Sequence, residues 1–158
     1  MLKHLLMLII PVMAGCTSAP NYLLAISTNP DTGREIIYNV IDSVPDRQQR
    51  ELPYQMTITW DYDSDTGMPS ATELARMYEM EDLIKPEVER QGMARWAYTA
   101  TGENWREWVF YTSSDQAFVE RVRKKLSQGE TYPIELTAQR EPGWDTYRAV
   151  RSNIVENP

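Results

Sequence analysis

Apolar and polar residues alternate in several short stretches of the chain, which is the pattern of strands in a sheet whose two faces differ. The clearest stretch runs from Tyr54 to Tyr62, where every second residue is apolar and the residues between are polar. Other stretches rich in β-branched and aromatic residues cover 22–27, 35–41, 93–101, 105–112 and 132–138. We therefore predict six strands.

Two further stretches repeat apolar residues every three or four positions, which is typical of a helix with one buried face. Each begins with a capping box, formed by Ser70 with Glu73 in the first helix and by Ser113 with Gln116 in the second. We expect Pro86 to kink or end the first helix. The apolar rows are Leu74, Met77, Tyr78, Ile84 and Val88, with Glu81 as the one charge among them, and Phe118, Val119, Val122 and Leu126.

From Tyr54 onward the predicted order is strand, helix, strand, strand, helix, strand, which is the split βαβ order of a ferredoxin-like βαββαβ sandwich. We expect an α+β fold in which two helices cover one face of an antiparallel sheet, with the first and third of these strands in its middle. Residues 22–51 should form an extra N-terminal β-hairpin and a polar loop, and residues 52–158 the main domain. A short helix is expected over 143–150.

The N-terminus has the layout of a secretory signal: Lys3, then an apolar run from Leu5 to Val12, then Ala14 and Gly15 before Cys16. The apolar run is too short to span a bilayer, which needs about 20 residues. The segment resembles the bacterial lipobox, at which a cysteine is acylated and becomes the first residue, although Met13 departs from the usual pattern. The alternative is an ordinary signal peptide in which the cysteine is a coincidence.

If Cys16 is acylated, residues 1–15 are a signal peptide, residues 16–21 are a lipidated tether, and the membrane is a partner through the lipid. The residue after the cysteine is Thr17 and not Asp. By resemblance to the enteric sorting rule, this favours the outer membrane, with the domain facing the periplasm.

Composition narrows the chemistry of the processed chain. Removing Lys3 leaves 15 basic and 23 acidic residues, so the net charge is −8, which argues against nucleic acid as a partner. The single histidine, His4, would be removed, and the single cysteine would be acylated. Ser-His-Asp and Cys-His catalysis and Cys/His zinc sites are thereby excluded, and we expect no cofactor. Catalysis would have to rest on carboxylates, Lys, Tyr or Ser.

Three strings carry a family resemblance: GMPSATELARMYEMED from Gly67, TGENWREWVFYTSSDQAF from Thr101, and YPIELTAQREPGWDTYRAV from Tyr132. Together they resemble domain-of-unknown-function family 695, over about residues 54–151. The resemblance implies a fold and assigns no activity.

Asp61, Asp63 and Asp65 alternate in a way that suggests a calcium loop. An EF-hand has glycine at its sixth position and glutamate at its twelfth, whereas Gly67 and Glu73 each come one place late. A solvated turn explains the aspartates equally well, and we predict no metal site.

Two groups of residues are candidates for contact with a ligand or partner. Arg106, Glu107 and Trp108 alternate on a predicted central strand, where they form either an aromatic groove or core packing with a cross-strand ion pair. Trp144 and Tyr147 either clamp a partner or attach the C-terminal tail to the sheet.

Two functions remain open at this point. We expect a non-catalytic envelope lipoprotein that binds an envelope protein or a small ligand, because no catalytic constellation is visible. The alternative is a carboxylate-dependent hydrolase that acts in the cell envelope, which a cleft with two carboxylates of raised pKa would favour.

Overall fold

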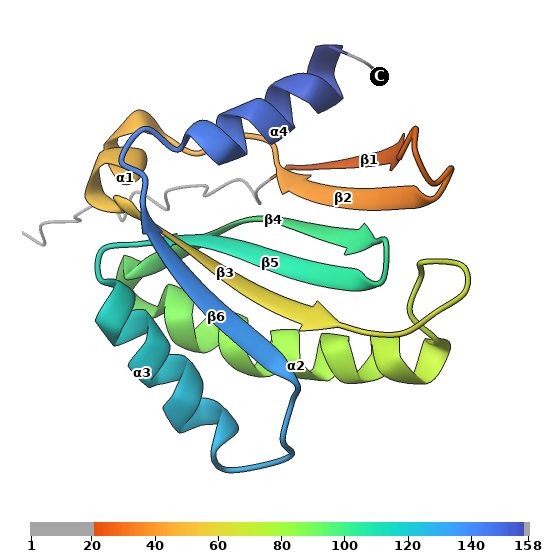
Figure 1. Ribbon diagram of the computed structural model, residues 1–158. Coiled ribbons are helices and arrows are strands. Elements are labelled where there is room, and N and C mark those ends of the chain that lie inside the picture. Colours follow the sequence, from red (N-terminus) through yellow and green to blue (C-terminus); the bar gives the residue numbers. More distant parts are fainter. Residues whose placement is uncertain (1–20, 157–158) are drawn as a thin grey trace, which may run out of the picture.

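The computed structural model describes residues 21–156 (Figure 1), so the predicted signal peptide and Cys16 lie outside the described residues. The strands are β1 (Tyr22–Thr28), β2 (Glu35–Ile41), β3 (Tyr54–Asp61), β4 (Ala94–Gly102), β5 (Trp105–Thr112) and β6 (Ile134–Arg140). The helices are α1 (Asp46–Glu51), α2 (Ala71–Glu89), α3 (Asp115–Leu126) and α4 (Asp145–Glu156), with a short 3₁₀ turn at Arg90–Gly92. The described residues thus form a mixed α+β fold.

The six strands form one antiparallel sheet in the order β1-β2-β4-β5-β3-β6. All six predicted strands are present, and the hairpin of β1 and β2 joins the sheet because β2 pairs with β4. Among the last four strands along the chain, the first and third, β3 and β5, lie between β4 and β6. The sheet is therefore two strands wider than the four-stranded sheet expected from Tyr54 onward.

Helices α2 and α3 lie side by side on one face of the sheet (Figure 1). Each helix has a serine N-cap. Ser70 caps α2 as predicted, because its Oγ accepts from the Glu73 N–H at 3.2 Å. The cap of α3 is Ser114 and not the predicted Ser113. Between the helices and the sheet lies the core, in which Trp60 of β3 and Phe118 of α3 are both completely buried.

The first helix does not end at Pro86, as one of the two expectations had it, because α2 continues through this residue to Glu89. Proline removes the hydrogen bond to the carbonyl four residues earlier, that of Asp82. Both Pro86 and Asp82 are exposed, so water can replace the lost partner. Ile84 and Val88 on either side are fully buried and hold the helix against the sheet.

The opposite face of the sheet carries the C-terminal helix α4, which is longer than the predicted segment 143–150 (Figure 1). The Tyr147 hydroxyl donates to the Ile41 carbonyl at 2.9 Å. The segment 42–51, expected to be a polar loop, contains the short helix α1. The Trp144 indole N–H donates to the Gln49 and Leu52 carbonyls, which ties α1 to the start of α4.

The layer of α2 and α3 is narrower than the sheet. A helix with its side chains is about 10–12 Å wide and strands lie about 4.8 Å apart, so two helices cover about four strands. One cross-strand row shows the result: Trp108 and Ile58 in its middle are fully buried, whereas Leu24 at the β1 end is 74% exposed and Leu136 at the β6 end is half-buried. Both ends of this face are therefore left open.

Candidate binding groove

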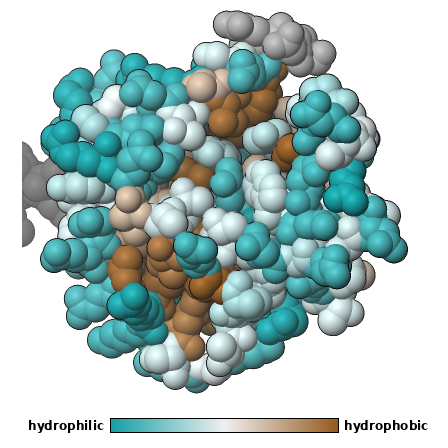
Figure 2. All heavy atoms as spheres, viewed as in Figure 1, coloured by the Kyte–Doolittle hydropathy of each residue, from teal (hydrophilic) through white to brown (hydrophobic). Residues whose placement is uncertain are grey.

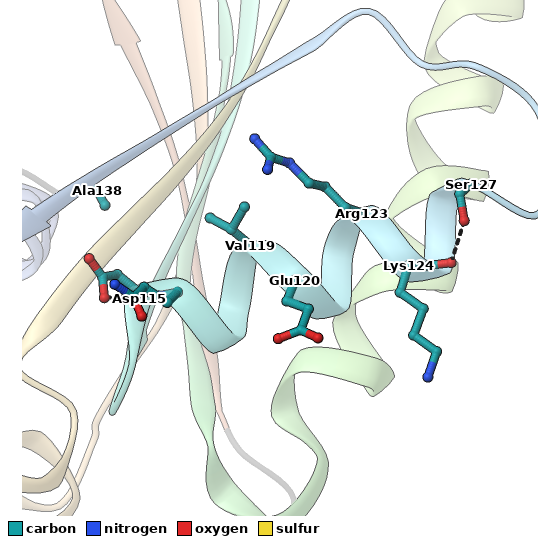
Figure 3. A pocket seen from close by; sticks show the side chains of 8 residues that line it. Asp115, Val119, Glu120, Arg123, Lys124, Ser127 and Ala138 are labelled. Atoms are coloured by element: carbon teal, nitrogen blue, oxygen red, sulfur yellow. Dashed lines mark hydrogen bonds between the residues drawn. The ribbon is translucent and has the colours of Figure 1, made fainter.

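An open groove lies between α3 and the edge strand β6. One hollow of about 730 Å³ runs along α3 beside Ala138 (Figure 3), and a second of about 540 Å³ continues along Ile134 and Leu136. Arg123 lines both hollows, so the two form one continuous surface.

The floor of the groove is apolar. Val119 and Leu126 of α3 and Ile134 and Leu136 of β6 are half-buried and pack against the core, while Ala138 is exposed. Figure 2 shows hydrophobic surface at this place, between the positions of α3 and β6 in Figure 1. These side chains remain partly exposed because β6 is the last strand and α3 does not reach over it.

Arg123 supplies an unpaired positive charge above this floor. Val119 and Arg123, one helical turn apart, extend to the same side of α3, whereas Glu120 and Lys124 extend away from it (Figure 3). The Arg123 guanidinium makes no hydrogen bond or ion pair with any residue that the structure describes. An exposed guanidinium that no described residue pairs with is available for an acidic group of a ligand.

The three consecutive candidates on β5 point to opposite faces of the sheet. Arg106 and Trp108 point toward α2 and are buried, and both donate to Glu81 Oε2, at 3.1 and 2.7 Å. The Arg106 guanidinium also lies 5.0 Å from the Tyr78 ring. The ion pair therefore joins a strand to a helix and does not run across strands, and these two side chains are buried between β5 and α2.

Glu107 points to the other face of the sheet, beside Tyr98 and Tyr38. Burial raises the pKa of the Glu107 carboxyl, and the hydrogen bond with Tyr98 lowers it by a smaller amount. Burial also raises the pKa of the Tyr98 hydroxyl, and the nearby Glu107 raises it further. This pair holds a carboxyl that keeps its proton to a higher pH than an exposed glutamate does.

Trp144 and Tyr147 attach the C-terminal segment to the sheet. The Trp144 ring stacks on Tyr111 at a centroid distance of 3.8 Å and meets the Tyr147 ring edge-on at 5.7 Å. Tyr111 donates to the carboxylate of Glu141, which is also buried. Trp144 and Tyr147 are buried, so neither presents a ring to solvent, and they lie apart from Arg106 and Trp108.

Asp61, Asp63 and Asp65 are exposed, at and beyond the end of β3. The Asp65 carbonyl accepts from Arg34 Nη2 at 3.1 Å, so backbone at this turn is bonded to the hairpin. Within residues 21–154, no three acidic, histidine or cysteine side chains come together as a group that could hold a metal ion. The turn thus has the features of a solvated connection.

The groove was not among the sites that the sequence indicated. The sequence pattern places Val119 and Leu126 in the buried row of their helix and gives β6 no feature that sets it apart from the other strands. The available signal was the width of that row on α3, which also includes Phe118 and Val122 and is broader than one sheet contact needs. Which of its members stay exposed depends on the position of β6, which the sequence pattern does not give.

No helix in the described part of the chain is long and apolar enough to cross a membrane. No curated protein matches the sequence significantly. One family model does match, over residues 39–150, a range that begins in β2, ends in α4 and contains all three strings that carry the resemblance. Since this match covers more than half of the sequence, the chain belongs to the Family of unknown function (DUF695).

Proposed function

We propose that the chain is an envelope lipoprotein, held through an acylated Cys16 on the periplasmic side of the outer membrane, whose domain binds an envelope protein without catalysing a reaction. The N-terminal segment supports the anchor, with its short apolar run followed by Ala14, Gly15 and Cys16. A lipidated cysteine with several acyl chains holds a protein firmly, so the domain needs no spanning helix.

We also propose that the part of the sheet from β4 to β6 is a ferredoxin-like sandwich to which the hairpin adds two strands. The order β4-β5-β3-β6 and the two helices on one face support this assignment. In this arrangement the groove lies at the outer edge of the sandwich, where β6 and α3 end the two layers.

The observation that carries the binding function is the groove with its apolar floor and the unpaired Arg123. Its chemistry fits a segment of a partner protein that places an apolar side chain between Val119 and Leu136 and an acidic group beside Arg123. A desolvated apolar contact with one charge-assisted hydrogen bond is a common recognition pattern in protein interfaces.

A second function, hydrolysis by carboxylates in the envelope, is favoured by the raised pKa of Glu107, because a general acid must hold its proton near neutral pH. We rank it second because Tyr98 already occupies this carboxyl and Glu107 lies on the sheet face opposite the groove. Hydrolysis of cell-wall glycan by the wild-type protein, lost in Glu107→Gln, would reverse this ranking.

Photo-crosslinking in intact cells tests the groove. A photoreactive amino acid is placed at Ala138 or at Thr137, which are adjacent and exposed on β6 and point to opposite faces of the sheet. We expect a crosslinked envelope protein from position 138 only, and we expect Arg123→Glu to abolish it. Equal crosslinking at both positions, or a crosslink that persists in Arg123→Glu, would contradict the assignment of the groove.

A further inference from the structure

Strand β1 exposes a stripe of three large apolar side chains. Tyr22, Leu24 and Ile26 are 52, 74 and 61% exposed, and as alternate residues they point to the same face of the sheet. The Tyr22 ring is held edge-on to Trp96 at 5.5 Å. The strand carries no charged residue and forms one edge of the sheet, and natural edge strands usually avoid this combination.

The stripe faces the same side as α2 and α3 but lies beyond their reach. The other side of β1 is partly covered, since Leu23 is half-buried and Ala25 lines a hollow with Val150 and Ile154 of α4. The strand therefore has one partly covered face and one open apolar face. The family model matches from residue 39 onward. All of β1 precedes this residue, so the stripe is not part of the region that the family shares.

The position of the stripe along the chain indicates what covers it. From Cys16 to Tyr22 is six residue steps, which at about 3.3–3.6 Å each span at most about 22 Å. If Cys16 carries lipid, β1 begins within this distance of the bilayer whatever path the tether takes. We propose, resting on the proposed lipid anchor, that the stripe of Tyr22, Leu24 and Ile26 lies on the bilayer surface next to the anchor.

The chemistry of the stripe fits the boundary between headgroups and acyl chains. Leu24 and Ile26 can enter the acyl region to shallow depth, and tyrosine favours the interface because its ring is apolar and its hydroxyl is polar. The N–H groups of the β1 edge that pair with no described strand stay at headgroup level, where water and phosphate can accept from them. The contact is apolar in origin, since the processed chain has a net charge of −8.

The test uses the full-length lipidated protein in vesicles of phosphatidylcholine and phosphatidylethanolamine, with either ordinary or brominated acyl chains. Acylation consumes the only cysteine, so a cysteine introduced at Leu24 is labelled alone with a thiol-reactive fluorophore. Ser27→Cys is the matched control, because Ser27 is exposed on the same strand and points to the opposite face. Leu24 is mostly exposed, so its replacement should not disturb folding.

We expect brominated chains to quench the label at position 24 and to leave the label at position 27 unquenched. Equal quenching by brominated chains at positions 24 and 27, in protein that still floats with the vesicles, would overturn the stripe contact and leave the anchor intact. Protection of position 24 from aqueous quencher without quenching by bromine, together with crosslinks between copies, would show that a second β1 edge covers the stripe and would also overturn it. Protein that does not float and carries no lipid on Cys16 would overturn both proposals.

Discussion

Glu81 on α2 accepts a 2.7 Å hydrogen bond from the indole N–H of Trp108 on β5. The same carboxylate oxygen accepts from Arg106 Nη2 at 3.1 Å, and the Arg106 guanidinium also donates to Thr101 at 3.0 Å. One acidic side chain thus satisfies two buried donors on a central strand. This accounts for the single charge in the apolar row of the first helix, because Glu81 faces the core and meets a positive group there.

Glu81→Ala should destabilise the protein by about 3–5 kcal/mol, because it leaves Arg106 charged, buried and without its acidic partner. Denaturant unfolding of purified variants measures this loss. The control is Glu79→Ala on the exposed side of the same helix, where a change within about 0.5 kcal/mol is expected. Similar stabilities of the two variants would show that the Arg106–Glu81 pair contributes little.

Trp60→Ala and Phe118→Ala should each cost about 3–5 kcal/mol of unfolding free energy, because both side chains are completely buried and their removal leaves cavities. Thr137→Ala on the exposed face of β6 should cost less than about 1 kcal/mol. Thermal and urea unfolding can compare the three. A loss at Trp60 no larger than at Thr137 would contradict its placement in the core.

Much of the fold could be predicted because its signals are local. Alternation places Met56, Ile58 and Trp60 on one face whatever the rest of the chain does, and Ser70 marks a helix start through one hydrogen bond. The continuation of α2 through Pro86 could not be predicted, because the packing of Ile84 and Val88 against the sheet decides it. Local preference was outweighed by tertiary contact.

The pairing of the hairpin with β4 and the groove beside β6 could not be predicted for a related reason. No local pattern predicts that Val40 lies opposite Tyr98. The pairing of strands far apart in sequence depends on the packing of the whole sheet. The exposure of Val119 and Leu24 depends on how many strands the two helices must cover. Sequence spacing gives the faces of strands and helices, and it does not give the width of the sheet.

Calcium at millimolar concentration should leave the melting temperature unchanged, because Asp61, Asp63 and Asp65 are exposed and the EF-hand spacing is not met. Differential scanning calorimetry with and without calcium tests this. An increase in melting temperature that Asp63→Ala removes would establish a calcium site at this turn.

Cys16→Ser should release the protein from membranes or leave its precursor uncleaved, because serine cannot carry the thioether lipid that signal peptidase II requires in the lipoprotein pathway that the segment resembles. Membrane fractionation and intact mass measure the two outcomes. Ser18→Ala, two residues further on, should change neither. Membrane retention and normal processing in Cys16→Ser would exclude the lipid anchor.

Glu107 should make stability depend on pH in a defined direction. Burial raises the pKa of its carboxyl in the folded state above its ordinary value of about 4.3. Between the ordinary and the raised pKa, the folded protein therefore binds more protons than the unfolded chain. The stabilisation from this group is therefore complete below the ordinary value and is lost as the pH rises through the raised one. Glu107→Gln cannot ionise, and its amide oxygen can still accept from Tyr98.

The free energy of unfolding of this variant relative to wild type should increase between about pH 4 and about pH 8, as measured by urea unfolding. Glu135→Gln, on the exposed face of β6, should show no such increase. A wild-type minus Glu107→Gln difference that stays constant over this range would mean that the buried carboxyl titrates alike in both states.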